Sequence, residues 1–145
     1  MIQKNKILNI LPHQYPFIFI DKIVECNEKD YIKTLKNVSL NDHFLQGHFN
    51  QYPVFPGVFI LESMAQSAYI LVKSSNQSDK QTNNSIFPIV KINDTVFKQF
   101  IYPGDQIYIS TTLKVYKHKF FIFESIAVVN SKIVAQSCIS LLNKQ

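Results

Sequence analysis

The sequence predicts an α+β fold in which an antiparallel β-sheet curls around one long central helix. Residues 58–72 carry apolar side chains nearly all the way round a helical wheel, which is typical of a buried helix. About six further segments have the alternating or β-rich patterns of strands. The chain has 145 residues, 46% of them hydrophobic, and can therefore form a full core, so we expect one domain over residues 1–145.

Two strands are expected before the helix. Residues 17–24 and 31–38 are rich in β-branched and apolar side chains, and the polar residues 27–30 between them indicate a turn. Residues 39–56 contain one glycine and two prolines, which interrupt regular structure, so we expect an irregular segment there.

Strands are also expected after the helix. The polar, low-complexity residues 74–85 predict a loop, and residues 86–99 are extended. Residues 120–129 and 133–142 should form a hairpin across residues 130–132. Residues 106–116 alternate, and one face of that strand should consist of Ile107, Ile109, Thr111, Leu113 and Val115. A small curved sheet of this kind leaves its edges open, which favours pairing with a second copy of the chain.

Charge and cysteine usage narrow the classes of function. The net charge is +5, but the lysines are scattered and the chain contains no arginine, so we expect no nucleic-acid partner. A basic surface fits an acidic protein partner or serves solubility. The sequence has no apolar run of membrane-spanning length and no signal-peptide pattern, so we expect a cytoplasmic protein without a membrane partner. Cys26 and Cys138 should be free thiols, with a disulfide as the less favoured alternative.

Residues 46–66 combine features that suit proton transfer next to a carbonyl group. His48 lies in the irregular segment, and a histidine changes charge near neutral pH, which suits a base. Gly57 follows a proline at the helix start, where unpaired N–H groups and the helix dipole favour a polarised carbonyl oxygen. Both features also have ordinary explanations, because loop histidines are often structural and Pro-Gly pairs are common at helix starts.

Glu62 is harder to explain by structure alone. A charged, unpaired carboxylate on a buried helix costs several kcal/mol, so it needs a partner or a function. The partner could be a lysine or a tyrosine hydroxyl. The functional alternative is a desolvated glutamate that holds a proton near neutral pH and donates it. Gln66 lies one helical turn further on, on the same face, and is placed to orient Glu62.

The other histidines add less. We expect His13 to pack against or shape the wall of a site, His43 to be structural, and His118 to lie in an exposed hairpin turn. The spacing of His43 and His48 does not fit a helical zinc pair, and the chain lacks a Gly-rich phosphate loop and a serine nucleophile elbow. No metal or cofactor is therefore expected.

Four segments, in this order, resemble the (3R)-hydroxyacyl-[acyl-carrier-protein] dehydratase family of FabZ type. They are LPHQYPFIFIDKI from Leu11, NVSLNDHFLQGHF from Asn37, PVFPGVFILESMAQSA from Pro53 and YPGDQI from Tyr102. The likeness spans nearly the whole chain. It implies a hot-dog fold, in which the sheet wraps a long central helix and two copies join their sheets. Members of this family often assemble further into hexamers, as trimers of dimers.

The resemblance also implies roles for single residues. It places the catalytic histidine at His48 and the catalytic glutamate at Glu62, which meet across the dimer interface, and the N–H group that binds the thioester oxygen at Gly57. Glutamate rather than aspartate argues against the related isomerases. The substrate would arrive on acyl carrier protein, an acidic partner. The expected substrate-binding residues are Gly57, Gln66, Phe49 and Val58.

Some residues depart from the family pattern. Gln14 stands where the family has arginine, and Asn50 replaces a proline after the GHF motif. Lys91, Asn93 and Val96 lie in a stretch that replaces the family's Gly-Ile-Asp-x-x-Arg-Phe. These changes bear on the acyl tunnel, on carrier docking and on the pathway, which is either ordinary fatty-acid synthesis or a specialised route to polyenes or other secondary lipids.

Two other functions fit the same residues. An acyl-thioester hydrolase on the same fold would use Glu62 to activate water for attack on the carbonyl. A non-catalytic partner subunit would only stabilise an active dehydratase.

Overall fold

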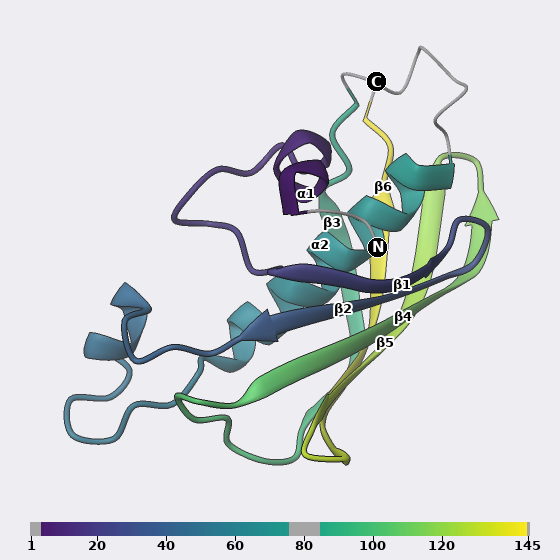
Figure 1. Ribbon diagram of the computed structural model, residues 1–145. Helices are drawn as coiled ribbons and strands as arrows, with labels where there is room; N and C mark the ends of the chain where they lie inside the picture. The colour runs from purple at the N-terminus through teal and green to yellow at the C-terminus, as the bar shows by residue number, and fades with distance from the viewer. Residues whose placement is uncertain (1–3, 76–84, 145) are drawn as a thin grey trace.

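The computed structural model describes residues 4–75 and 85–144. Its elements are α1 (Lys4–Ile10), β1 (Lys22–Asn27), β2 (Tyr31–Asn37), the 3₁₀ helix η1 (His43–Gln46), α2 (Gly57–Ser75), β3 (Ile89–Phe97), β4 (Gln106–Lys117), β5 (Phe120–Val129) and β6 (Lys132–Leu142). The strands form one six-stranded antiparallel sheet in the order β1-β2-β4-β5-β6-β3. Figure 1 shows this sheet curving around α2, with α1 beside α2 and β1. The predicted α+β hot-dog architecture is confirmed.

The core lies between α2 and the inner face of the sheet. Met64 and Ile70 of α2 are fully buried in the same apolar cluster as Ile109 of β4 and Phe123 of β5. A helix with apolar side chains on nearly all sides can bury itself only when a sheet surrounds it. The helix contains the predicted residues 58–72 and extends by one residue at its start and three at its end.

Two tight turns join the long strands β4, β5 and β6, one at each end of β5. His118 and Lys119 connect β4 to β5 with φ angles of 49° and 70°, and Asn130 and Ser131 connect β5 to β6 with φ angles of 48° and 65°. Two successive left-handed residues match the right-handed twist of paired strands. The predicted hairpin of β5 and β6 is confirmed, with β6 beginning at Lys132, and His118 is exposed in the β4–β5 turn, as expected.

The first predicted strand is wrong in its N-terminal half. Residues 17–24 were expected to be extended and paired, but β1 begins only at Lys22. The reason is a side chain on α2: the Phe19 N–H donates to Gln66 Oε1 at 2.9 Å, and Gln66 Nε2 donates to the Phe17 carbonyl at 3.0 Å. The backbone here is therefore satisfied by an amide side chain rather than by a neighbouring strand.

The alternation predicted for residues 106–116 holds only as far as Leu113. The pairing of β4 with β5 shifts register between Leu113 and Val115. Beyond this shift the predicted inner face is lost, and Val115 is 44% exposed. A bulge adds one residue to one strand and so reverses which face later side chains occupy.

Other boundaries differ from the sequence prediction. Helix α1 was not predicted, and it is held by the buried side chain of Ile7. Strand β3 occupies Ile89–Phe97, which is shorter than the expected residues 86–99. Of the expected loop at residues 74–85, the first two residues belong to α2, and residues 76–84 lie outside the described part of the chain.

Two further expectations concern membranes and thiols. No helix in residues 4–75 or 85–144 is long and apolar enough to cross a membrane. Cys26 and Cys138 are free and half-buried, and burial raises the pKa of both thiols. These thiols are therefore poorly ionised near neutral pH.

Candidate active site

His48 lies between η1 and α2, in a segment that extends beyond the sheet (Figure 1). Its ring nitrogen Nδ1 is 2.7 Å from the Val54 carbonyl oxygen, and the Val54 N–H donates to the His48 carbonyl at 2.8 Å. Because a carbonyl oxygen only accepts hydrogen bonds, Nδ1 carries the hydrogen when the ring is neutral. The other nitrogen, Nε2, then has a free lone pair and can act as a base.

Glu62 lies on the second turn of α2, and its side chain is 18% exposed. Its Oε1 accepts a hydrogen bond from Gln66 Nε2 at 3.0 Å and lies 3.3 Å from Nε2 of His13. The carboxyl group is thus half-buried and held by two neighbours. The carboxyl group therefore has partners, as expected for a carboxylate on this helix. The partners differ from the expected ones, because they are an amide and an imidazole rather than a lysine or a tyrosine hydroxyl.

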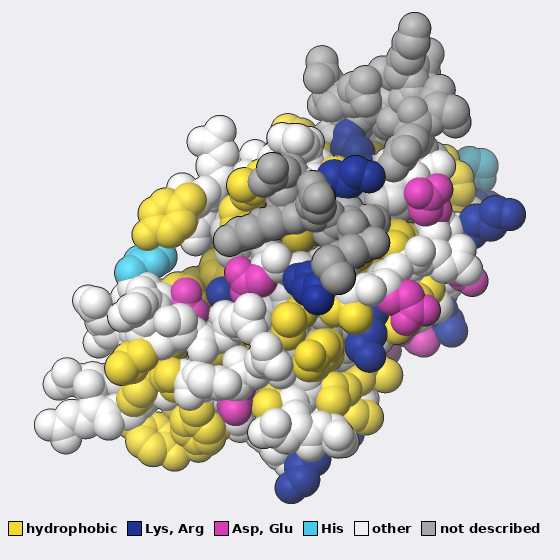
Figure 2. Space-filling view, in the orientation of Figure 1, with side chains coloured by type: hydrophobic (Ala, Val, Ile, Leu, Met, Phe, Trp, Pro, Cys, Tyr) yellow, Lys and Arg dark blue, Asp and Glu magenta, His cyan; other side chains and the backbone are white. Residues whose placement is uncertain are grey.

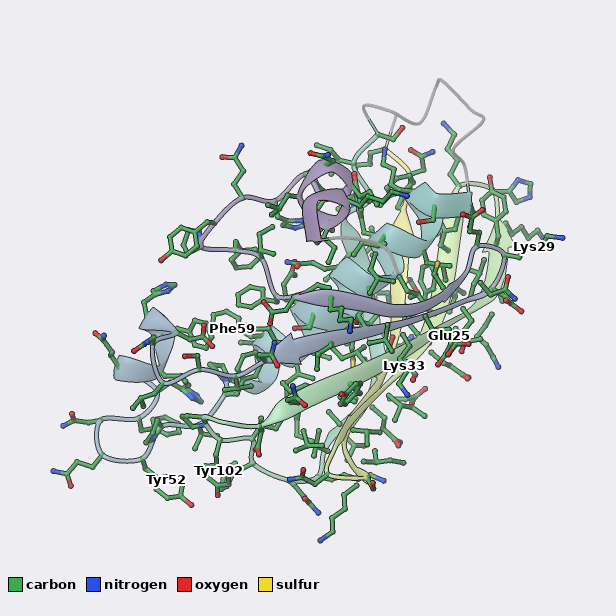
Figure 3. All side chains as sticks on the ribbon, viewed as in Figure 1. Glu25, Lys29, Lys33, Tyr52, Phe59 and Tyr102 are labelled. Carbon is green, nitrogen blue, oxygen red and sulfur yellow. The ribbon has the colours of Figure 1, made fainter. Side chains whose placement is uncertain are left out.

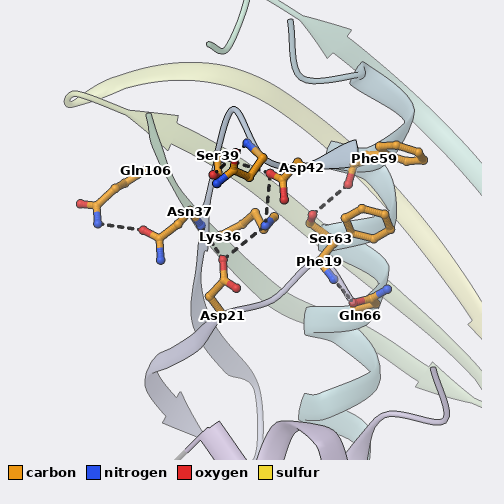
Figure 4. Close-up of polar contacts among 11 residues, drawn as sticks. Phe19, Asp21, Lys36, Asn37, Ser39, Asp42, Phe59, Ser63, Gln66 and Gln106 are labelled. Carbon is orange, nitrogen blue, oxygen red and sulfur yellow. Dashed lines mark hydrogen bonds and ion pairs between the residues drawn. The ribbon is translucent and has the colours of Figure 1, made fainter. Parts of the chain in front are cut away.

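Gln66 is fully buried and uses all of its polar atoms (Figure 4). Its Oε1 accepts the Phe19 N–H, and its Nε2 donates both to the Phe17 carbonyl and to Glu62. A flipped amide would set oxygen against the Phe17 carbonyl and nitrogen against the Phe19 N–H. The orientation of the amide is therefore fixed, and Gln66 orients Glu62 from the next turn, as its spacing indicated.

A cavity of about 200 Å³ opens beside Glu62. It is mostly apolar, with polar atoms supplied by His13, Glu62 and Tyr69. The Tyr69 hydroxyl donates to the Ser85 carbonyl at 3.0 Å, and burial raises the pKa of this tyrosine, so it stays protonated near neutral pH. The remaining lining residues are Pro12, Ala65, Ile86, Phe87, Pro88 and Ile89. Such a wall suits an apolar chain that ends near one carboxyl group.

The start of α2 presents free backbone donors. The N–H groups of Phe59 and Ile60 donate to the Pro56 carbonyl at 3.0 and 3.3 Å, whereas no hydrogen bond from the Gly57 or Val58 N–H is found among the described residues. A Cβ on Gly57 would lie 3.0–3.2 Å from ring atoms of Phe97, which is too close for an ordinary contact. Glycine fits here without displacing the aromatic ring of Phe97, which packs directly on the helix start.

The structure gathers some of the predicted site residues and leaves others apart. No hydrogen bond or ion pair joins His48 and Glu62 in the described chain, and His48 does not line the cavity beside Glu62. Phe49 stacks on the His48 ring with centroids 4.0 Å apart and is 54% exposed, and Val58 is 66% exposed. The surroundings of His48 and of Glu62 are therefore separate within a single chain.

The contact between His13 and Glu62 was missed by sequence reasoning, which gave His13 only a wall-forming role. The residue lies 49 positions before Glu62, and only the path of residues 11–21 across α2 brings the two together. His43 is exposed on η1, where it contacts the ring of Phe44, in agreement with a structural role.

A cluster of charges ties the His48 segment to the sheet (Figure 4). Lys36 Nζ lies 3.5 Å from Asp21 Oδ2 and 3.7 Å from Asp42 Oδ2, and the lysine side chain is only 8% exposed. The same carboxylates accept backbone N–H groups, Asp21 from Asn37 at 2.6 Å and Asp42 from Ser39 at 3.0 Å. Every charged group of this cluster is paired, so we interpret the cluster as a structural contact that holds the segment against the sheet. A cavity of about 290 Å³ lies beside the cluster, but we do not assign it to the site for this reason.

The surface near this segment is aromatic. Figure 3 shows Tyr52 and Tyr102 side by side at one end of the molecule, and their hydroxyl oxygens lie 2.8 Å apart. The pKa of Tyr102 is raised, chiefly by its hydrogen bond with Tyr52.

In the view of Figure 2, lysine side chains lie singly rather than in one dense patch. Across the described residues, no group of three or more His, Cys, Asp or Glu side chains could hold a metal ion.

A long helix wrapped by an antiparallel sheet defines the hot-dog fold. The structure is similar to a chain of the dehydratase heterocomplex ApeI:P from Xenorhabdus doucetiae, with a TM-score of 0.81, 17% identity and coverage of 96% of this chain and 91% of that one. It is also similar to a hypothetical thioesterase with coenzyme A from Streptococcus pneumoniae, with a TM-score of 0.66, 9% identity and coverage of 85% and 84%. At these identities the likeness shows the fold alone.

Sequence comparison gives the family. The model of the FabA-like domain matches residues 11–138. The chain is 43% identical over 139 residues to the 3-hydroxyacyl-[acyl-carrier-protein] dehydratase FabZ of Buchnera aphidicola subsp. Acyrthosiphon pisum, covering 96% of this chain and 91% of the relative. It is 39% identical over 144 residues to FabZ of Cupriavidus taiwanensis, covering 99% and 95%. The chain therefore belongs to the FabA-like family, among the 3-hydroxyacyl-[acyl-carrier-protein] dehydratases of FabZ type.

Proposed function

We propose that this protein is a hydro-lyase that removes water from a (3R)-hydroxyacyl group on acyl carrier protein and leaves the trans-2-enoyl thioester. The observation that carries the proposal is the Glu62 carboxyl group, held by Gln66 at the wall of a mostly apolar cavity. The FabZ-named relatives match nearly the whole chain that contains it. The product would enter fatty-acid synthesis or a related route to secondary lipids.

His48 is the base of the proposed reaction. Its Nε2 takes the proton from the carbon next to the thioester carbonyl, because Nδ1 is already bonded to the Val54 carbonyl. The electron pair of the broken C–H bond forms the new carbon–carbon double bond. The carbonyl group also stabilises the charge that builds while the proton leaves.

The start of α2 binds the thioester oxygen in this proposal. The free N–H of Gly57 points along the helix axis together with its dipole, so it favours an oxygen that gains negative charge. Val58 offers a second free N–H, and the Phe97 ring limits the space above the turn. Interactions that strengthen as the enolate forms accelerate the reaction rather than only binding the substrate.

Glu62 completes the elimination. It gives a proton, directly or through a water molecule, to the hydroxyl group, whose bond to carbon breaks so that water departs. The proton that His48 gained and the proton that Glu62 lost must be exchanged with solvent before the next turnover. The acyl chain would lie in the apolar cavity lined by Phe87 and Ile89.

The proposed active unit is a homodimer in which His48 of one subunit meets Glu62 of the other. Support comes from the separation of His48 and Glu62 within a single chain and from β3, which pairs with β6 on one edge only. That open edge is apolar and exposed at Val90, Ile92 and Val96. An uncovered apolar edge strand tends to pair with another chain, so a second copy is the natural cover. Further assembly into a hexamer is an extension of the same proposal.

Acyl carrier protein is the proposed carrier of the substrate. The relatives are named for this carrier, and a net charge of +5 suits an acidic partner. Opposite net charges accelerate encounter, so the rate should fall as salt is raised. We place the reaction in the cytoplasm, where the two free thiols would stay reduced.

One assay separates dehydration from the hydrolase alternative. The protein is incubated with a 3-hydroxyacyl carrier thioester and, separately, with a saturated acyl carrier thioester of equal length. Enoyl absorbance from the hydroxy substrate, with no thiol released from the saturated one, is the expected result. Released thiol would indicate a hydrolase. Absence of both products would indicate a non-catalytic partner subunit, and repeating the assay over short, medium and long chains would define the chain-length preference.

A further inference from the structure

The two oxygens of Glu62 have different surroundings. The Gln66 amide is locked by the Phe19 N–H and the Phe17 carbonyl, so it can present only an N–H group to Glu62. Oε1 of Glu62 accepts that hydrogen at 3.0 Å. Whether or not the carboxyl group is protonated, Oε1 therefore accepts this hydrogen bond from Gln66 with one of its lone pairs.

His13 approaches the same oxygen from the other side, with its Nε2 3.3 Å from Oε1. The second ring nitrogen, Nδ1, is buried and has no hydrogen-bond partner among the described residues. An unpaired N–H is rarer and more costly in a protein interior than an acceptor left unpaired. The hydrogen of the neutral His13 ring therefore belongs on Nε2, where it faces Glu62, and Nδ1 stays bare.

We propose that His13 is a positioning residue, a neutral imidazole that donates from Nε2 to Oε1 of Glu62. Together with Gln66 it keeps Oε1 as an acceptor, so the transferable proton lies on Oε2. This inference rests on the proposed function, because reserving one oxygen matters only if Glu62 transfers a proton. Once that proton has left, two donors at Oε1 stabilise the negative charge that remains.

The surroundings of His13 hold its ring in one orientation. Phe17 stacks on it with centroids 5.9 Å apart, and the edge of Tyr69 meets it at 6.5 Å. Glu62 is the one carboxylate among the residues that line this cavity.

Two substitutions at His13 separate a donor from a proton carrier and from simple packing. His13→Gln keeps an N–H near the position of Nε2 but cannot titrate, whereas His13→Ala removes the donor. We expect His13→Ala to lower kcat about 10- to 100-fold, the effect of one hydrogen bond to a charged group, and His13→Gln to restore kcat to within about threefold. KM and both limbs of the kcat pH profile of His13→Gln should match the wild type. His43→Gln, the same change at an exposed site, is the control for the substitution itself.

The activity results overturn the proposal if His13→Ala keeps its full kcat. They also overturn it if His13→Gln is as slow as His13→Ala while both variants melt like the wild type, because the titrating ring would then be needed. A readout independent of turnover is ¹⁵N NMR of histidine-labelled protein at neutral pH. We expect a His13 ring protonated at Nε2 and bare at Nδ1, and any other ring state contradicts the proposal. A wild type that dehydrates nothing would instead overturn the proposed function and leave the NMR result standing.

Discussion

His48 and Val54 exchange two hydrogen bonds, from the ring Nδ1 to the Val54 carbonyl at 2.7 Å and from the Val54 N–H to the His48 carbonyl at 2.8 Å. The pair closes the loop that precedes α2 and fixes the ring at the same time. The bond to a main-chain carbonyl sets the tautomer without a carboxylate partner, so the backbone itself orients the proposed base.

Replacing the ring should remove the base but keep the loop. In His48→Ala the backbone bond between Val54 and residue 48 remains, so the melting temperature should change little. The dehydration rate should fall about 10²-fold or more, because proton abstraction loses its acceptor. His43→Ala, an exposed histidine on η1, is the matched control and should keep its rate. A His48→Ala protein with wild-type turnover would contradict the proposed base.

Glu62→Gln tests proton donation with the smallest change of shape. The amide can keep an oxygen toward Gln66 and His13, so folding should be nearly unaffected. The departing hydroxyl would lose its acid, and turnover should fall about 10²-fold or more. Stopped-flow or steady-state enoyl absorbance gives the rate, and circular dichroism checks the fold. Full turnover in this variant would remove Glu62 from the mechanism.

The elements that depend on local sequence could be predicted, and those that depend on distant contacts could not. The buried helix was predictable because apolar residues surround it, and so was the β5–β6 hairpin, because its strands end at polar turn residues. The end of β4 was not, since the shift that exposes Val115 depends on pairing with β5. The first part of the strand expected at residues 17–24 is absent because Gln66, far along the chain, takes the backbone hydrogen bonds of Phe17 and Phe19.

The candidate site divides in the same way. The spacing of Glu62 and Gln66 on one helix face is local, and their hydrogen bond follows from it. The contact of His13 with Glu62 is set by tertiary structure, and nothing in the local pattern of residues 11–16 indicates it. The meeting of His48 and Glu62 depends on a second chain, which neither local pattern nor the fold of one chain supplies, and it stays a prediction.

Gln66 should be more important for stability than any other polar residue of α2. In Gln66→Leu, the buried Phe19 N–H and Phe17 carbonyl lose their partners, and Glu62 loses a donor. Unpaired buried groups of this kind should lower the free energy of unfolding by about 3 kcal/mol or more. Urea denaturation measures the change, and Gln46→Leu, at an exposed glutamine, is the control. Equal midpoints for both variants would show that these bonds contribute little.

Gly57 and Phe97 should show coupled effects on stability. In Gly57→Ala the new methyl group meets the Phe97 ring at 3.0–3.2 Å, so the ring must shift, at a cost of about 1–3 kcal/mol. Phe97→Leu removes ring atoms and should make room for that methyl group. The two changes together should therefore cost less than the sum of the single changes, by about 0.5 kcal/mol or more in a double-mutant cycle measured by denaturation. Additive costs would mean that the ring moves freely.

The proposed sharing of sites between subunits predicts that two inactive variants restore activity when mixed. His48→Ala and Glu62→Gln homodimers each lack one group in both sites. A hybrid dimer places both defects in one site and leaves the other site with an intact His48 and an intact Glu62. Random exchange makes about half of the dimers hybrid, so about a quarter of all sites should work. Mixing, mild denaturation and refolding should raise the dehydration rate to about that fraction of the wild type, whereas His48→Ala refolded alone should stay inactive. If each chain instead built a complete site by itself, the mixture would remain as inactive as its components, because every chain in it carries one defect.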